Sequence, residues 1–286
     1  MALLTPMTLA EARAIGSEYG LDIASVEALR AGSVNSNFRL RTVRGEDYFL
    51  RVYEEQDGQG AGRELEMIAA LARLGVPTPP PRERVQKASA GSPGLGRHAA
   101  RHAGKPVGVH AWVAGESVCL RQVTTARVRQ LGRALARVHA CSPAVSRLPE
   151  GRFEIRDLLR RLEHVERVDA RFAADTRLIR DRIAQHASAA SDLPRGLIHG
   201  DLFRDNVLWQ GDELVALLDF ESASSGYFIY DLMVCAHAWC YGEAYDLSLV
   251  GALFQGYEEV RRLESAEWDA LLPQGCLGAL RFATTR

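Results

Sequence analysis

The residues that most clearly suggest chemistry lie between His199 and Asp219. Asp201 follows the apolar run Gly196–Ile198 and sits in a short polar loop, where a carboxylate can face a cleft. Asn206 opens a second apolar run, and Asp219 closes a third. A loop carboxylate in this setting is a candidate general base, and the other two side chains carry oxygen atoms of the kind that bind hard metal ions.

The two apolar runs beyond the loop predict a β-hairpin. Val207–Trp209 and Leu214–Leu218 have the composition of short strands, and Gly211-Asp212 between them suits a two-residue turn. Such a turn pairs Gln210 with Glu213, which sets the expected register of the hairpin.

In this register the two candidate metal ligands are neighbours. Asn206 is expected opposite Leu217, so Asp219 becomes its diagonal neighbour on the same face, at a spacing of about 7–8 Å. Mg²⁺ takes few protein oxygens and completes its shell with phosphate and water. A base at Asp201 beside such a metal pair provides what phosphoryl transfer to a hydroxyl group requires.

Each of these residues also has an ordinary explanation. Asp201 taken alone is equally a solvated loop acid, and Asn206 and Asp219 are equally turn residues. The joint pattern, H-G-D-L-F-R-D-N at residues 199–206 followed by L-L-D-F at residues 217–220, is far more specific than any one of them.

Three stretches resemble one known family. Residues 199–208 resemble the H-x-D-x-x-x-x-N loop of the aminoglycoside phosphotransferase and choline kinase superfamily, most closely in its type II homoserine kinase branch. Gly32–Phe38 resembles that branch's G-x-x-N-T-N-Y/F phosphate loop, and Gln130–His139 resembles its G-x-A-L-A-x-L-H helix. The likeness runs from about residue 20 to the end of the chain.

The resemblance implies a role for each matching residue. Asp201 would be the catalytic base, Asn206 and Asp219 would hold Mg²⁺, and His199 would brace the loop. Asp231 would be the buried acid that ties the loop to the following helix. An N-terminal cap of that helix is the alternative role for Asp231.

Arg204, on the same loop, is a further candidate catalytic residue. Its guanidinium fork suits an acceptor carboxylate or the γ-phosphate. The alternative is an ordinary loop arginine paired with Asp205 or with solvent.

The nucleotide, ATP by resemblance, is expected to bind in the N-terminal part of the chain. The turn at residues 32–37 could present backbone N–H groups to the phosphates. Arg51 stands where related kinases usually carry a lysine, and its expected acidic partner is Glu64, with Glu66 as the alternative. The ordinary explanation for these residues is a solvated surface. The complete expected set is Gly32, Ser33, Asn35, Ser36, Arg51, Glu64 and, for adenine, the backbone near Ala111 and Val113.

These residues must be positioned by two lobes. A capping box at Thr8–Glu11 predicts a first helix, alternating patterns at residues 24–53 predict three antiparallel strands, and residues 61–74 predict a second helix. From about Thr124 the pattern is helical, with a long helical region at Arg152–Ala190. The fold class is α+β and protein-kinase-like, with a nucleotide-binding lobe at residues 1–111 and a helical catalytic and substrate lobe at residues 112–286.

Composition excludes several other classes of protein. The 35 basic and 36 acidic residues nearly cancel, so no charge excess favours nucleic acid or a membrane surface. The N-terminus lacks the pattern of a secretory signal, and the 5 cysteines do not suggest a disulfide framework, so we expect a cytoplasmic protein.

A zinc site at Cys235–Cys240 and a dinucleotide fingerprint at Gly94–Ala99 both lack the required context.

The sequence thus predicts an ATP- and Mg²⁺-dependent kinase for a small alcohol, with L-homoserine as the acceptor that the resemblance implies. Aminoglycosides, choline or ethanolamine, and other hydroxy-amino acids are alternative acceptors. A catalytically silent nucleotide-binding module is the alternative outside enzymes. Members of the family usually continue past the position of Arg286 with another helix, and the sequence leaves open whether this chain is truncated there. Oligomeric state is not predicted.

Overall fold

The computed structural model describes residues 4–29, 34–85, 95–145, 148–149, 151, 154–187 and 192–285. The chain divides into two compact units, Met1–Ala114 and Gly115–Arg286. The predicted boundary between residues 111 and 112 lies close to this division.

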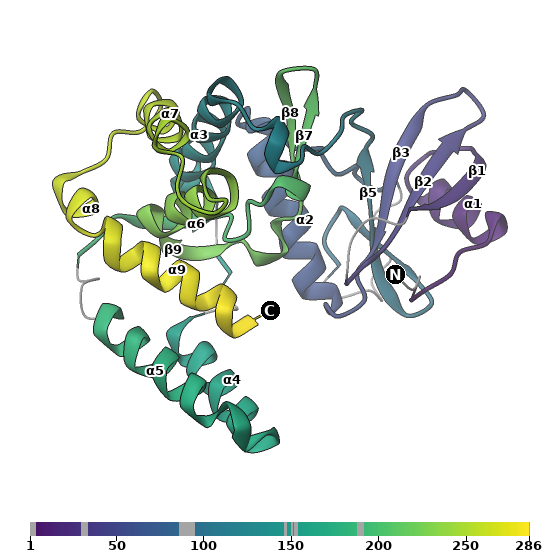
Figure 1. The fold of residues 1–286 in the computed structure, drawn as a ribbon. Coiled ribbons are helices and arrows are strands. Elements are labelled where there is room, and N and C mark those ends of the chain that lie inside the picture. Colours follow the sequence, from purple (N-terminus) through teal and green to yellow (C-terminus); the bar gives the residue numbers. More distant parts are fainter. Residues whose placement is uncertain are drawn as a thin grey trace. The chain divides into compact units, whose positions relative to one another are not determined.

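The N-terminal unit is built on a five-stranded antiparallel sheet with strand order β1-β2-β3-β5-β4 (Figure 1). The three strands expected between residues 24 and 53 are present, and a further strand pair, β4 and β5, completes the sheet. The strands are β1 (Ile23–Leu29), β2 (Ser36–Thr42), β3 (Asp47–Val52), β4 (Ala99–His102) and β5 (Lys105–Ala111).

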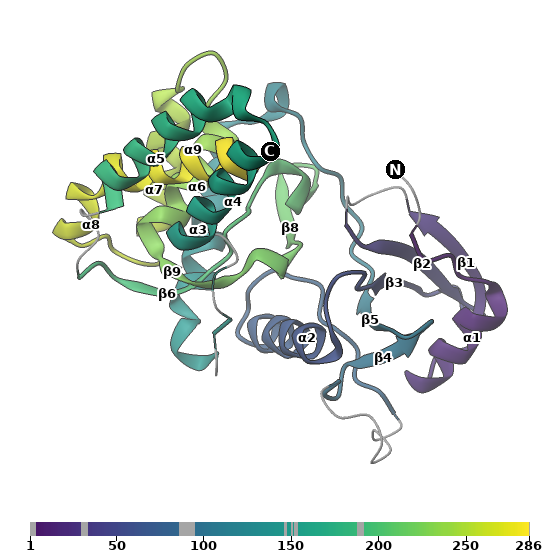
Figure 2. The ribbon, with the colours of Figure 1, turned by 90° about the horizontal axis from the view of Figure 1, so that it is seen from below.

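One helix covers each face of this sheet (Figure 2). Helix α1 (Leu9–Glu18) begins at the predicted capping box, in which Thr8 and Glu11 exchange hydrogen bonds, and its apolar side packs on Val107 and Val109 of β5. Helix α2 (Gly58–Arg73) lies on the opposite face, where Gly108 leaves room for Leu65. Alternate residues of β5 therefore serve two separate cores.

The C-terminal unit is mainly helical, as predicted. Two short sheets, β6–β9 and β7–β8, are embedded among its helices. Its helices are α3 (Thr125–Ala140), α4 (Ile155–Val168), α5 (Ala173–Ala187), α6 (Phe228–Cys240), α7 (Leu247–Glu258), α8 (Ser265–Asp269) and α9 (Leu271–Thr285). Its strands are β6 (Arg195–Ile198), β7 (Val207–Gln210), β8 (Glu213–Leu217) and β9 (Ser224–Tyr227).

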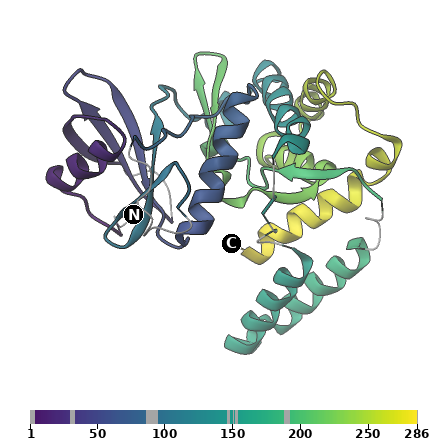
Figure 3. The same ribbon diagram turned by 180° about the vertical axis from the view of Figure 1, so that it is seen from behind.

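The long helical region expected at Arg152–Ala190 is two helices rather than one. Helix α4 ends at Asp169, whose extended backbone (φ −146°, ψ 100°) turns the chain into α5. Both helices pack against α9, and Leu158, Leu162, Ile183 and Leu277 form their shared core (Figure 3). Strand β9, which the sequence did not predict, lies just before α6 and pairs with β6.

Helices α3 and α7 pack closely through two glycines. A Cβ atom on Gly132 would lie 2.2 Å from the carbonyl oxygen of Leu253, and one on Gly256 would lie 1.9 Å from that of Arg129. Real Cβ atoms cannot approach backbone so closely, so the glycines set the distance between the two helices. No helix in the described part of the chain is long and apolar enough to cross a membrane.

This helix contact predicts the outcome of a glycine substitution. Gly256→Ala should lower the free energy of unfolding by about 1–3 kcal/mol, because the added methyl group must push α3 and α7 apart. Gly251→Ala, on the same helix with nothing within 4 Å of its added Cβ, is the matched control and should be neutral or stabilising by up to about 1 kcal/mol. Denaturant unfolding of both variants measures the difference, and equal effects would contradict this account of the packing.

Candidate active site

The loop that carries Asp201 begins at the end of the buried strand β6. Gly200, the first residue after His199, has φ +75°, a conformation that favours glycine. A Cβ at this position would also lie 2.9 Å from the carbonyl oxygen of Ser222. The chain therefore turns sharply here and brings the half-buried Asp201 out of the sheet, with a side chain that is 30% exposed.

The backbone of this loop is held by a buried carboxylate. Asp231, on the first turns of α6, accepts hydrogen bonds from the backbone N–H groups of His199 (2.7 Å) and Gly200 (2.8 Å). It also accepts one from Nε2 of His139 on α3 (3.0 Å). The carboxylate thus bonds to the loop, which agrees with the role implied by the resemblance, and makes no capping bond to its own helix.

These hydrogen bonds stabilise the ionised form of Asp231. Burial by itself raises the pKa of a carboxyl group, but the bonds and charge of His139 and the backbone N–H of His199 hold the pKa of Asp231 below its usual value. Burial lowers the pKa of His139, with Asp231 opposing the shift. The Nδ1 atom of His139 lies 2.7 Å from the hydroxyl of Tyr257 on α7.

His199 joins the loop to the neighbouring hairpin. Its ring is fully buried, and Nε2 lies 2.9 Å from the carbonyl oxygen of Leu218. Nδ1 accepts a longer contact, 3.4 Å, from the backbone N–H of Asp201. With Nε2 as the donor, one neutral tautomer satisfies both contacts. This geometry fits the expected bracing role.

The hairpin that carries the candidate metal ligands has a different register from the predicted one. Gln210 pairs with Glu213 as expected, but a bulge on β8 shifts the ladder, and Leu217 lies opposite Val207 instead of Asn206. Asn206 instead accepts a hydrogen bond at its backbone oxygen from the N–H of Leu218, at 2.8 Å. The predicted diagonal relation to Asp219 is therefore wrong, because the unpaired residue of a bulge moves every later pair by one position.

The donor atoms of this pair nevertheless suit a hard cation. Asn206 donates from Nδ2 to the backbone oxygen of Asp201 (2.8 Å), which leaves its Oδ1 as the atom available to a metal ion. Asp219 follows directly after the hairpin in a left-handed conformation (φ 60°, ψ 68°), which Asp tolerates better than most residues and which often occurs at functional sites. One amide oxygen and one carboxylate are ligands that fit Mg²⁺ and do not fit a soft metal.

The side chain of Arg204 binds helix α6. It belongs to a short 3₁₀ turn, η5 (Arg204–Asn206), and donates from Nη1 to the backbone oxygen of Ala238 near the C-terminal end of α6. The arginine therefore binds an orphan helix carbonyl. The alternative pairing with Asp205 is not among the described interactions, and the expected contact of Arg204 with the acceptor stays a prediction.

In the N-terminal unit, the described part of the expected phosphate loop is tied to Glu54. Gly32 and Ser33 lie outside the described residues. Asn35 accepts from the backbone N–H of Glu54 at Oδ1 (3.1 Å), and the hydroxyl of Ser36 donates to its carboxylate (2.5 Å). Lys105 pairs with the same carboxylate. These side chains hold the start of β2 in place, so phosphate contacts would come from backbone N–H groups.

Arg51 lies on β3 directly opposite Asn37, and its Nε donates to Oδ1 of Asn37 at 3.3 Å. Glu64 is buried on α2 and accepts from Gln56 at 2.7 Å. Glu66, the alternative partner, instead pairs with Arg97 at 3.2 Å. Glu66 is thus engaged elsewhere, and Glu64 as the partner of Arg51 stays a prediction.

The expected adenine-binding residues follow the sheet. Ala111 is the last residue of β5, and Val113 lies two residues beyond it, outside the strand; both are half-buried. A backbone-mediated contact at these positions stays a prediction.

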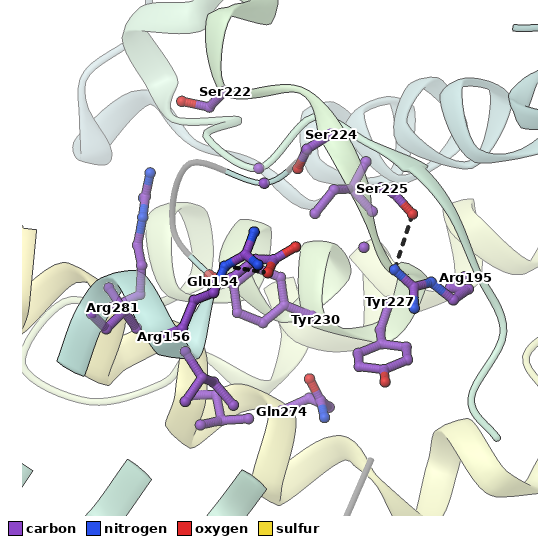
Figure 4. A pocket seen from close by; sticks show the side chains of 17 residues that line it. Glu154, Arg156, Arg195, Ser222, Ser224, Ser225, Tyr227, Tyr230, Gln274 and Arg281 are labelled. Atoms are coloured by element: carbon purple, nitrogen blue, oxygen red, sulfur yellow. Dashed lines mark hydrogen bonds and ion pairs between the residues drawn. The ribbon is translucent and has the colours of Figure 1, made fainter. Parts of the chain in front are cut away.

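The C-terminal unit contains a cavity of about 390 Å³ beside the Asp201 loop (Figure 4). Gly200 of the loop is part of its wall, together with residues from the start of α4, the β6–β9 pair and α9. Its charged and phenolic lining residues are Glu154, Arg156, Arg195, Tyr227, Tyr230 and Arg281. Burial raises the pKa of Tyr230 to about 12, so its hydroxyl stays a neutral donor.

The cavity carries an excess of positive charge. Three arginines and one carboxylate are among its described lining residues. Arg156 pairs with Glu154 at 3.2 Å, while Arg195 donates to the hydroxyl of Ser225 at 3.1 Å and stacks on Tyr227. A small molecule with an anionic group suits this environment better than a polycation.

Arg281 was not predicted from the sequence, although it contacts the candidate base. Its Nη1 lies 3.0 Å from Oδ1 of Asp201. It is the single charged residue of the otherwise apolar and polar-neutral segment Leu271–Thr285. A lone arginine in an apolar helix is a signal that could have identified it, because a buried charge needs a partner.

Comparison with known proteins identifies the family of this chain. Residues 25–271 match the model of the phosphotransferase enzyme family. The homoserine kinase of Methylobacterium radiotolerans is 35% identical over 296 aligned residues that cover 100% of this chain and 87% of the relative. The homoserine kinase of Agrobacterium fabrum is 32% identical with the same coverage.

The fold of this chain is also similar to the folds of solved structures. The structure of a microcompartment-associated aminopropanol kinase covers 97% of this chain and 88% of its own, with a TM-score of 0.70 and 21% identity. The mixed α+β architecture predicted from the sequence is thereby confirmed. With a family match over most of its length and relatives above 30% identity, the chain belongs to the phosphotransferase enzyme family and is a small-molecule kinase.

Proposed function

We propose that this protein is an L-homoserine kinase that uses ATP and Mg²⁺. The observation that carries the proposal is the similarity to curated homoserine kinases along the whole chain. The cavity supports it independently, since its arginines suit an acceptor with a carboxylate. The reaction forms a bond between the acceptor oxygen and the γ-phosphorus and breaks the bond from that phosphorus to the leaving ADP oxygen.

Asp201 accepts the proton that the hydroxyl group loses in this step. Its Oδ1 is bound to Arg281, and none of the described hydrogen bonds engages Oδ2, which is therefore the oxygen available to the acceptor. Asn206 and Asp219 hold Mg²⁺, which when bound neutralises charge on the phosphates. Asn35, Ser36, Arg51 and Glu64 belong to the nucleotide-binding part of the chain.

The role of Asp201 predicts the effect of a neutral isostere. Asp201→Asn should lower kcat by about 10²-fold or more, because the amide cannot accept the proton, while nucleotide affinity stays within a few-fold. Asp205→Asn removes an exposed carboxylate from the same loop and should leave kcat unchanged. Steady-state assays of ADP release measure both, and near-normal turnover of Asp201→Asn would remove this residue from the mechanism.

The role of Asp219 is tested by nucleotide binding rather than by turnover. Asp219→Asn tolerates the left-handed backbone but loses the charge, so Mg²⁺-dependent affinity for ATP should fall by about tenfold or more. Asp212→Asn alters an 83% exposed carboxylate in the turn of the same hairpin and serves as the control. Calorimetry with and without Mg²⁺ distinguishes the two, and unchanged Mg²⁺-ATP affinity in Asp219→Asn would make Asp219 a structural turn residue.

The acceptor itself is tested with a substrate that lacks only the carboxylate. 3-Aminopropan-1-ol keeps the ammonium group and terminal hydroxyl of L-homoserine at the same spacing. A site built around an anion should favour L-homoserine in kcat/KM by at least about 100-fold. Choline and an aminoglycoside complete the panel in an assay coupled to ADP release. Preference for any of these cations would overturn the homoserine proposal and leave the kinase chemistry intact.

A further inference from the structure

Arg281 lies at the point where the last helix meets the catalytic loop. Its side chain is 4% exposed, while that of its partner Asp201 is 30% exposed. An arginine in such a buried place is stable only with a counter-charge at hydrogen-bond distance. The Asp201 carboxylate, 3.0 Å away, supplies that charge.

Packing fixes where the guanidinium group lies. It stacks over the ring of Phe282, with 4.1 Å from its central carbon to the ring centroid. Phe282 in turn meets Phe203 of the catalytic loop edge to face, at 4.8 Å and 80°. The backbone N–H of Phe203 donates to the backbone carbonyl oxygen of Asp201 at 2.8 Å. Helix α9 therefore contacts the loop both through the base itself and two residues beyond it.

Arg281 is also one of the residues that line the proposed acceptor cavity. Figure 4 shows Arg281 on α9 beside the cavity that Glu154 and Arg156 also line. By binding Oδ1 of Asp201, Arg281 restricts rotation of the carboxylate and decides which oxygen faces an incoming hydroxyl group. Correct placement of a base supplies much of the rate in phosphoryl transfer, and a displacement of about 1 Å can cost about 10²-fold.

We propose that Arg281 is a positioning residue for the catalytic base. It holds the Asp201 carboxylate in the orientation in which Oδ2 accepts the acceptor's proton. The inference rests on the proposed role of Asp201 and adds a residue from the final helix to the machinery. Arg281 acts through Asp201, so its contribution should vanish when Asp201 can no longer act as a base.

A double-mutant cycle tests this dependence. Arg281→Met should lower kcat for L-homoserine by about 10²-fold and change the KM for ATP by less than about threefold. In the Asp201→Asn background the same substitution should change the residual kcat by less than about threefold, because no carboxylate remains to be positioned. A loss of similar size in both backgrounds would overturn the proposal.

Chemical rescue separates positioning from a structural role. Millimolar guanidinium should restore at least about tenfold of the kcat lost in Arg281→Ala, because the free cation can occupy the space beside Asp201. Arg133→Met removes an ion pair with Glu259 that links α3 to α7, away from the cavity. This control should keep its activity and show no rescue.

Two further results would distinguish a role of Arg281 in folding or catalysis from a role of Asp201. If Arg281→Ala fails to fold by thermal denaturation, the cycle is repeated with Arg281→Lys, which keeps the charge but not the fork and should lose kcat only where Asp201 is intact. If Arg281→Met is fully active while Asp201→Asn is inactive, the proposed role of Arg281 is rejected. The proposed role of Asp201 as the base is kept. Near-normal turnover of Asp201→Asn would instead reject the proposed base.

Discussion

The geometry of the active site depends on one buried carboxylate. Asp231 has no exposed surface, and its oxygens accept hydrogen bonds from α3 and from the first two residues of the catalytic loop. A buried charge is tolerated only when such bonds replace its lost hydration. The need to satisfy Asp231 therefore fixes the loop against two helices, and the positions of His199, Gly200 and Asp201 follow from that anchoring.

Three further contacts extend this anchoring to the rest of the site. His199 connects the loop to the β7–β8 hairpin, because its ring nitrogen bonds to the carbonyl oxygen of Leu218, next to Asp219. Asn206 returns to the backbone of Asp201 through its amide nitrogen, so the candidate base and one candidate metal ligand are directly joined. Arg281 then connects the base to α9. A rigid network of this kind suits phosphoryl transfer, where positioning and charge supply most of the catalysis.

The cavity beside the Asp201 loop adds charged groups to this network. Glu154 is the one carboxylate among the described lining residues, against Arg156, Arg195 and Arg281. Each of the three arginines is already held by a partner: Arg156 by Glu154, Arg195 by Ser225 and Arg281 by Asp201. Preorganised guanidinium groups lose little conformational freedom when they bind a carboxylate. Under the proposed function, the charge of the cavity and the geometry of the loop would both contribute to the choice of acceptor.

The sequence by itself determined the fold class, the kinase chemistry and the identity of the loop residues. Local patterns sufficed, because a capping box, strand alternation and the spacing of His199, Asp201 and Asn206 are properties of short segments. The tertiary structure alone decided the bulge that shifts the hairpin register and the attachment of Arg204 to α6. It also decided the pairing of Asp201 with Arg281, 80 residues later in the chain. Such contacts depend on how distant segments pack, and nothing in the local sequence of either partner encodes the other.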